Sequence, residues 1–342
     1  MVEVSPYIKD IQKSLRSLDL SSLESSNILI TGATGLIGSC LVDVLMSIGS
    51  CFVYAHGRNE ERAKKRFSNY WNTNRFFFIK GDITKPLDSN VNFDYIIHAA
   101  SNASPNFFKE KPVEVITSNI IGTQHLIEYG LSHEMKRMLF VSSGEIYGEG
   151  SGKAFVETDS GYIDCATTRA CYPSSKRAAE TLCVSYADEY GTDVVIARPC
   201  HTYGPFFTES DNRVYAQFIR NVLNGDDIVL KSKGEQYRSW IYVVDCVSAL
   251  LTILCKGKKG NAYNVADEFS TISIKELAEL VANHSSKKVC FDIPSTPSQG
   301  NTTPISSAVF STEKLYSLGW HPIFSIAEGI SHTIDTLSAH NL

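Results

Sequence analysis

A tyrosine and a lysine spaced for proton transfer stand in the middle of the chain. Tyr172 and Lys176 are four residues apart in CYPSSKRAAETL, so a helix would place both side chains on one face. A lysine ammonium beside a phenol favours the phenolate and lowers the tyrosine pKa from its reference value of about 10. Ser143, at the end of the strand-like run RMLFVSS, would add a hydroxyl to the group. This combination predicts proton exchange with an alcohol of the substrate.

A glycine-rich turn precedes these residues in the chain. In NILITGATGLIGS, Gly32, Gly35 and Gly38 follow an apolar run and open a helical stretch. Glycines allow a tight turn and a close approach of the backbone, and a helix N-terminus offers N–H groups to a pyrophosphate. The pattern predicts a dinucleotide site. Its further residues are expected in the turn, at later strand ends and on the next helix: Thr34, Leu36, Ile37, Asp82, Ile83, Ala99, Ala100, Ser101, Asn119 and Pro199.

The choice between NAD and NADP depends on the end of the second strand-like run. NAD enzymes commonly place an acid there, roughly 20 residues beyond the glycines. This chain has His-Gly-Arg at 56–58 instead. Arg58 could stack on adenine and pair with a 2'-phosphate, so NADP is slightly favoured over NAD. The basic residues that follow, Lys64, Lys65 and Arg66, are expected to be the solvated start of a surface helix.

The elements that must position these residues alternate along the chain from Asn27. Strand-sized apolar runs are separated by amphipathic helical stretches, which predicts an α/β fold with a doubly wound parallel sheet. Residues 1–26 are expected to form a helical extension, and 27–205 a Rossmann domain whose sheet is completed by about 236–266. A smaller C-terminal substrate-binding lobe would comprise 206–235 and 267–342. Ligands of such sheets bind beyond the carboxyl ends of the strands.

Three segments, FVSSGEIYG, CYPSSK and ARPCHTYGP, together with TGATGLIG, resemble the extended short-chain dehydrogenase/reductase family. This family contains the NAD(P)-dependent epimerases, dehydratases and decarboxylases of nucleotide sugars, and the resemblance covers nearly the whole chain from Asn27. It implies that Tyr172 is the acid/base and that Ser143 hydrogen-bonds the reacting oxygen. It also implies that Tyr172 and Lys176 contact the cofactor, with Lys176 on the nicotinamide ribose.

Glu145 indicates which branch of the family the chain is similar to. A Glu at this place resembles both the sugar-nucleotide dehydratases and the UDP-glucuronate decarboxylases. The dehydratases precede it with an Asp that protonates the departing hydroxyl, and this chain has Gly144 there. TRACYPSSKRAAETL and NRVYAQFI are more similar to the decarboxylases. Glu145 is therefore a candidate second base, with a salt-bridged loop carboxylate as the alternative.

Three further residues are candidates for substrate binding. His201 stands where the family's RxxNxYGP motif usually has Asn, and it would either contact the substrate or be a satisfied buried histidine. Arg238 matches a family Arg that meets the diphosphate or a substrate carboxylate. Arg213 is a candidate second anion clamp, since a guanidinium binds such groups bidentately.

The function expected from this site is oxidation of carbon 4 of a nucleoside-diphosphate sugar. Epimerisation, elimination or decarboxylation of the 4-keto sugar would follow, and the hydride could then be returned. The alternative is an NADPH-dependent reductase of a nucleotide-linked keto sugar or ketose. A non-catalytic nucleotide-binding regulatory subunit is less favoured, because Ser143, Tyr172 and Lys176 are all present.

Composition excludes several other classes of protein. The 342 residues carry a formal net charge of -5, without the basic surface expected of a partner of nucleic acid or anionic membranes. The nine cysteines form no CxxC pair, which argues against a disulfide framework and against a metal site. No apolar run is long enough to span a bilayer, and MVEVSPYIKD does not resemble a signal peptide. We expect a cytoplasmic homodimer.

Overall fold

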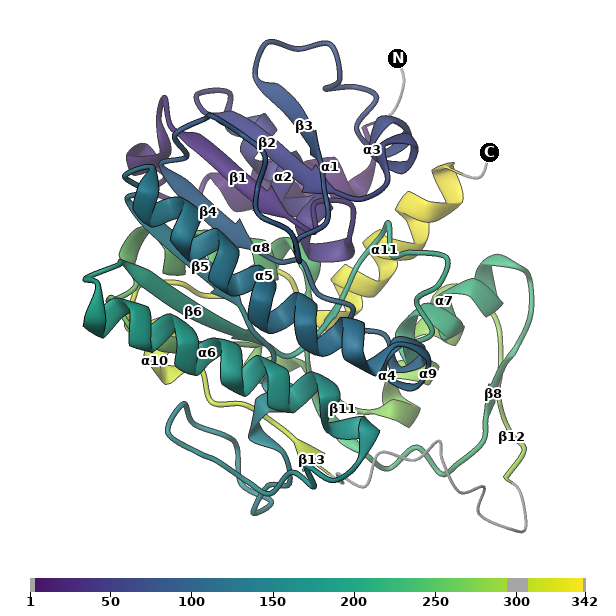
Figure 1. Ribbon diagram of the computed structural model, residues 1–342. Helices are drawn as coiled ribbons and strands as arrows, with labels where there is room; N and C mark the ends of the chain where they lie inside the picture. The colour runs from purple at the N-terminus through teal and green to yellow at the C-terminus, as the bar shows by residue number, and fades with distance from the viewer. Residues whose placement is uncertain (1–3, 294–306, 341–342) are drawn as a thin grey trace.

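The computed structural model describes residues 4–293 and 307–340, and within them a large parallel β-sheet forms the centre of the molecule (Figure 1). Its seven strands are all parallel and lie in the order β10-β6-β5-β4-β1-β2-β3. The strands are β1 (Asn27–Thr31), β2 (Phe52–Gly57), β3 (Phe76–Lys80), β4 (Tyr95–His98), β5 (Arg137–Val141), β6 (Val194–Pro199) and β10 (Ala262–Val265).

The strand order reverses between β1 and β4. From β1 the chain proceeds through β2 and β3 in one direction, and then through β4, β5 and β6 in the other. The central strands are short apolar runs buried on both faces, as in NILIT and YIIH. Such a reversal opens a crevice at the carboxyl ends of the two strands, where ligands of these sheets bind. The predicted doubly wound α/β fold is confirmed.

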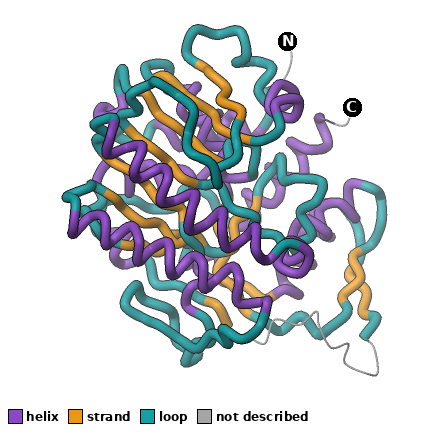
Figure 2. Tube along the Cα trace, in the orientation of Figure 1, coloured by secondary structure: helices purple, strands orange, loops and turns teal. Residues whose placement is uncertain are grey.

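Helices cover both faces of this sheet (Figure 2). On one face α5 (Pro112–Ser132) and α6 (Cys171–Glu189) pack side by side. On the other face α2 (Leu36–Ile48) and α8 (Val243–Lys256) pack against each other. This double cover explains why the strands carry no alternation of polar and apolar residues.

The N-terminal helix α1 (Pro6–Leu15) packs against α2, α8 and the C-terminal helix α11 (Ile326–His340). The hydroxyl of Tyr7 donates to Asp43 of α2 at 2.7 Å. Asp10 accepts a hydrogen bond from the hydroxyl of Tyr242 at 3.0 Å. It also contacts Nδ1 of His332 on α11 at 2.9 Å. The first and last helices therefore pack against each other.

A smaller lobe follows the large sheet. The strand β9 pairs with three short strands, and β8 pairs with β12. Of the stretch 236–266, only β10 joins the large sheet, because β9 is hydrogen-bonded within the lobe. The strands are β7 (His201–Tyr203), β8 (Ile228–Leu230), β9 (Tyr237–Tyr242), β11 (Thr271–Ser273), β12 (Val289–Phe291) and β13 (Ser307–Ala308). The helices are α7 (Val214–Leu223), η4 (Glu268–Ser270), α9 (Ile274–His284), α10 (Glu313–Tyr316) and α11 (Ile326–His340).

The short helix α3 (Glu60–Arg66) corrects one expectation about the basic cluster. Lys64 and Lys65 are exposed as expected. Arg66 instead forms an ion pair with the buried Asp43, and its guanidinium lies 4.5 Å from the ring centre of Phe206. Its side chain is therefore held between the two lobes rather than solvated, because a buried carboxylate needs a paired charge.

The nine cysteines are all free thiols. Across residues 4–293 and 307–340, no group of three or more His, Cys, Asp or Glu side chains could hold a metal ion. The helices in these same ranges include none that is both long and apolar enough to cross a membrane.

Candidate active site

The turn between β1 and α2 forms a cradle of bare backbone. Gly32 has a φ of +67°, and a Cβ there would lie 2.7 Å from the Cα of Ala100 and the carbonyl oxygen of Ala99. A Cβ on Gly38 would lie 2.2 Å from the carbonyl oxygen of Gly32. Gly35 is the N-cap of α2, and no side chain caps the helix. The N–H groups of its first turn are therefore available to an anion.

The other predicted cofactor residues lie in the turn, on α5, and at or after the ends of strands of the large sheet. Thr31 Oγ1 accepts the N–H of Ala100 at 3.2 Å and contacts Nδ1 of His98 at 2.7 Å, which ties β1 to β4. Asn119 donates to Ser175 of α6 at 2.9 Å. The set comprises Thr34, Leu36 and Ile37 in the turn and the start of α2, Asp82 and Ile83 after β3, Ala99, Ala100 and Ser101 after β4, Asn119 on α5, and Pro199 at the end of β6.

These residues fit a dinucleotide. The backbone cradle at the start of α2 suits a pyrophosphate, because no side chain stands between the N–H groups and the ligand. The Oδ1 atom of Asn119 is buried and has no hydrogen-bond partner among the described residues, which leaves one acceptor for a ligand.

Replacing Gly38 by Ala is expected to weaken NAD(P) binding by about tenfold or more, because the Cβ would push the turn out of the conformation that approaches the pyrophosphate. Titration of the dinucleotide by calorimetry measures the effect. Ser47→Ala, on the same helix but away from the turn, is the control and should bind normally. Normal binding by a folded Gly38→Ala protein would show that the cradle is not the pyrophosphate site.

The predicted catalytic residues converge at the carboxyl end of β5. Tyr172 and Lys176 lie in the first turns of α6, and Ser143 directly precedes the short helix η2 (Gly144–Tyr147). Lys176 is almost fully buried, and its Nζ donates to the carbonyl of Val141 at 2.8 Å. Burial lowers the pKa of Lys176 to about 7, so its charge is only partly retained at neutral pH.

The hydroxyl of Tyr172 is protonated at neutral pH in this structure. Burial, followed by the charge of Glu145, raises the pKa of Tyr172 to about 12. A hydrogen bond with Ser143 and the charges of Arg213 and Arg169 act in the opposite direction. The expected net lowering of the tyrosine pKa is not met here, because burial and the charge of Glu145 outweigh the groups that lower it.

Glu145 is paired with an arginine that sequence analysis did not single out. Arg169, in the helix η3 (Thr168–Ala170), donates to Glu145 at 2.8 Å. Its guanidinium also lies 5.1 Å from the ring centre of Phe108 on α4 (Pro105–Glu110), and that ring stacks on Tyr172 at 4.9 Å. Arg169 therefore links the candidate base to the candidate acid. In the sequence, only its position three residues before Tyr172, just ahead of the helix, could have pointed to Arg169 as a site residue.

Gly144 has no room for a side chain. A Cβ there would lie 2.4 Å from Cζ of Phe310, which comes from the segment after β13. The ring of Phe310 is buried against Tyr147 and Phe155 and cannot move aside easily. The carboxylate that the family's dehydratases carry at this place is thus excluded by packing.

His201 and Arg238 lie together on paired strands of the smaller lobe. His201 opens β7, and its ring lies 5.2 Å from that of Trp240 on β9. Burial, helped by the charges of Arg238 and Arg213, lowers the pKa of His201 to about 3, so the imidazole is neutral. Its Nδ1 has no hydrogen-bond partner within the described residues. Arg238 is buried and donates to the carbonyl of Tyr237 at 2.7 Å.

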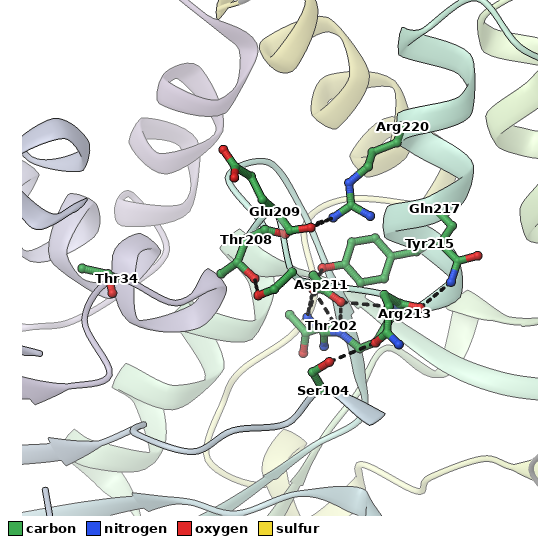
Figure 3. A network of polar contacts seen from close by, with 12 residues as sticks. Thr34, Ser104, Thr202, Thr208, Glu209, Asp211, Arg213, Tyr215, Gln217 and Arg220 are labelled. Carbon is green, nitrogen blue, oxygen red and sulfur yellow. Dashed lines mark hydrogen bonds and ion pairs between the residues drawn. The ribbon is translucent and has the colours of Figure 1, made fainter. Parts of the chain in front are cut away.

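Arg213 belongs to a dense polar network before α7 (Figure 3). Its guanidinium donates to both carboxylate oxygens of Asp211, at 2.9 and 2.6 Å, and to the hydroxyl of Tyr215 at 3.1 Å. The residue before Arg213, Asn212, accepts a hydrogen bond from Ser104 of the other lobe at 2.9 Å. Arg213 is therefore held rigidly beside the site, with its carboxylate-binding edge already occupied by Asp211.

Arg58 follows β2 as predicted, but its guanidinium is not free. It donates to Glu114, in the first turn of α5, at 2.6 Å. Arg62, one helical turn further, donates to the carbonyl of Thr34 in the glycine turn at 2.9 Å. The basic side chains near the turn are thus engaged by a carboxylate and by the backbone.

Comparison with known proteins identifies the family. Residues 28–266 match the model of the NAD dependent epimerase/dehydratase family. The chain is 34% identical over 307 residues to UDP-glucuronic acid decarboxylase 6 of Arabidopsis thaliana, covering 89% of this chain and 86% of that protein. The chain belongs to the NAD dependent epimerase/dehydratase family. It is also 31% identical over 343 residues to UDP-glucuronic acid decarboxylase 1 of Xenopus tropicalis, covering 97% and 78% of the two chains.

A solved structure of another protein has the same fold as this chain. The crystal structure of a UDP-glucose 4-epimerase from Thermotoga maritima superimposes with a TM-score of 0.80 at 24% identity, over 92% of this chain and 100% of that one. The predicted family, enzyme class and NAD(P) dependence are confirmed. The roles of the individual site residues stay predictions.

Proposed function

We propose that this enzyme oxidises carbon 4 of a UDP-linked hexuronic acid and then decarboxylates the 4-keto sugar. The observation that carries the proposal is the grouping of Tyr172, Ser143 and Glu145 at one strand end, with Gly144 closed by Phe310. Relatives of this chain named UDP-glucuronic acid decarboxylase add support. UDP-glucuronic acid is therefore the substrate to test first.

In the proposed first step Tyr172 loses its own proton to solvent, and the resulting phenolate takes the proton of the 4-hydroxyl. NAD(P), held at the glycine turn, would supply the hydride acceptor for carbon 4 and the donor that restores the hydride. Ser143 donates a hydrogen bond to the same oxygen and orients it toward the phenol. Arg213 and Arg169 support the step, since their charges lower the pKa of Tyr172 against the effects of burial and Glu145.

The second step follows from the chemistry of the 4-keto sugar acid. Its carboxylate is β to the keto group, so the bond between carbons 5 and 6 breaks, carbon dioxide leaves and the electron pair moves onto the oxygen at carbon 4. Tyr172 and Ser143 hydrogen-bond that oxygen. Carbon 5 then takes up a proton, which the Glu145 carboxylate relays from solvent, and Arg169 keeps that carboxylate in place.

The residues proposed to bind the substrate surround this centre. Arg238, buried on β9, would meet the diphosphate or the sugar carboxylate. His201 would use its open Nδ1 for a hydrogen bond to the substrate, because a neutral imidazole both donates and accepts. Arg213 would act through its positive charge rather than by binding an anion bidentately, since the paired N–H groups of its guanidinium already bind Asp211. Lys176 would hold the nicotinamide ribose.

A panel of UDP, CDP, GDP and dTDP sugars tests the nucleotide, because a ligand that binds only the native state raises the melting temperature. We expect UDP-glucuronic acid to give the largest shift. Incubation should then release carbon dioxide and yield a UDP-pentose, without net consumption of reduced cofactor. No product from UDP-glucuronic acid, together with a larger shift by another nucleotide sugar, would contradict the proposal.

A net NADPH-dependent reductase is not favoured. The family match and the decarboxylase relatives indicate chemistry in which the hydride is recycled. The reductase alternative rests on the lack of an acid at 56–58, and the guanidinium of Arg58 at this place is engaged by Glu114. Stoichiometric loss of absorbance at the reduced-cofactor band on adding a keto sugar would restore that alternative.

The enzyme is further proposed to be a cytoplasmic homodimer. The outer faces of α5 and α6 expose the apolar side chains of Ile116, Ile121 and Val184, which a second copy would cover. The nine free thiols are typical of a reducing compartment. Sedimentation velocity tests the dimer through the mass of the particle, and fractionation of native cells tests the compartment.

A further inference from the structure

The order of strands divides the dinucleotide site into two ends. The glycine turn follows β1. On one side of β1, two strands away, lies β5, which is followed by Ser143. On the other side lies β2, which is followed by Arg58. Neighbouring strands are about 4.8 Å apart, so a dinucleotide with its pyrophosphate at the turn reaches the reaction centre with one end only. Its adenosine end must then lie beyond β2, beside Arg58.

At this adenosine end, Arg58 is bridged to another element by an ion pair. Its Nη1 lies 2.6 Å from Oε1 of Glu114, in the first turn of α5. The side chain of Arg58 is 54% exposed and that of Glu114 is 30% exposed, so both groups can be reached by a ligand. This ion pair is thus open to solvent. It joins the segment after β2 to the first turn of α5 at the adenosine end of the site.

Glu114 is fixed from more than one direction. Asn102, after β4, donates to its Oε1 at 3.0 Å, and Lys111 lies 3.8 Å from its Oε2. The hydrogen bond from Arg58, followed by its charge, lowers the pKa of Glu114, so this carboxylate is ionised at neutral pH. It would remain in place, and negative, if Arg58 moved toward a ligand.

We propose that Glu114 is the residue that selects NAD over NADP, supplying from α5 the carboxylate that the end of β2 lacks. The 2'-hydroxyl of an adenosine ribose can donate a hydrogen bond to Glu114 while Arg58 stays paired. A 2'-phosphate has no proton to offer and would stand beside a fixed carboxylate. It would also have to compete with that carboxylate for Arg58. An unpaired Arg58 would favour NADP, but Arg58 is paired with Glu114.

The inference concerns the cofactor alone and does not depend on which sugar the enzyme converts. Its test is the equilibrium binding of NAD and NADP to the full chain, stripped of nucleotide and measured by calorimetry without any sugar. The unmodified enzyme should bind NAD about tenfold or more tighter than NADP. Glu114→Gln should reduce this ratio by about tenfold, mainly by tightening NADP, because Arg58 is released to meet the 2'-phosphate.

Two further variants make the result specific. Glu128→Gln removes the same charge from the far end of α5, where Glu128 contacts Gln124 and Tyr186, and it should leave the ratio unchanged. Arg58→Ala combined with Glu114→Gln should lose the gain in NADP binding. Tighter binding of NADP by the unmodified enzyme, or an unchanged ratio in a Glu114→Gln protein with a normal melting temperature, would overturn the proposal. Neither result bears on the decarboxylation itself.

Discussion

Tyr172→Phe is expected to lower the rate of reaction by about 100-fold to 10,000-fold, because the ring still packs but no proton can be exchanged with the sugar hydroxyl. Phe keeps the stacking on Phe108 that holds the ring at 4.9 Å. Affinity for the dinucleotide should therefore change little. Single-turnover formation of reduced cofactor, measured with saturating sugar nucleotide, reports this step directly.

The matched control is Tyr186→Phe, on the same helix. Its hydroxyl contacts Glu128 on the outer surface at 3.0 Å, so the variant loses an equivalent group away from the site and should react normally. Turnover by Tyr172→Phe within a few-fold of the unmodified enzyme would remove Tyr172 from the role of acid/base. Loss of cofactor binding in the same protein would indicate a structural defect instead.

Glu145→Gln is expected to stall the reaction after the first hydride transfer. Gln keeps the size and hydrogen-bonding capacity of the side chain but removes the carboxylate that serves carbon 5. Reduced cofactor should accumulate in a single turnover, while release of carbon dioxide and formation of the UDP-pentose fall by about 100-fold or more. Completion of the whole reaction at an unchanged rate would leave Glu145 as a structural partner of Arg169.

The same variant should shift the pH dependence of the first step. The charge of Glu145 raises the pKa of Tyr172, so its removal lowers that pKa. Arg169, released from its ion pair, acts in the same direction. The rise of the single-turnover rate with pH, which follows ionisation of Tyr172, should therefore move to lower pH. Glu149→Gln, a nearby acid outside these contacts, should leave the profile where it is.

The sequence by itself determined the features that depend on near neighbours in the chain. The glycine turn of TGATGLIG and the helix Leu36–Ile48 were predictable, because turn geometry and helix periodicity are set within a few residues. The spacing of Tyr172 and Lys176 correctly placed both on one helix. The apolar runs likewise predicted the parallel sheet, since strands buried on both faces must be apolar throughout.

Only the tertiary structure decided which charges meet. Arg58 pairs with Glu114, 56 residues away, and Gly144 is closed by Phe310 from the far end of the chain. Arg66, predicted as solvated, is drawn in by the buried Asp43. The direction of the Tyr172 pKa shift is likewise decided by burial and by the charge of Glu145. The physical reason is that a charge responds to whatever lies within a few ångströms of it, and packing brings distant parts of the chain to that range.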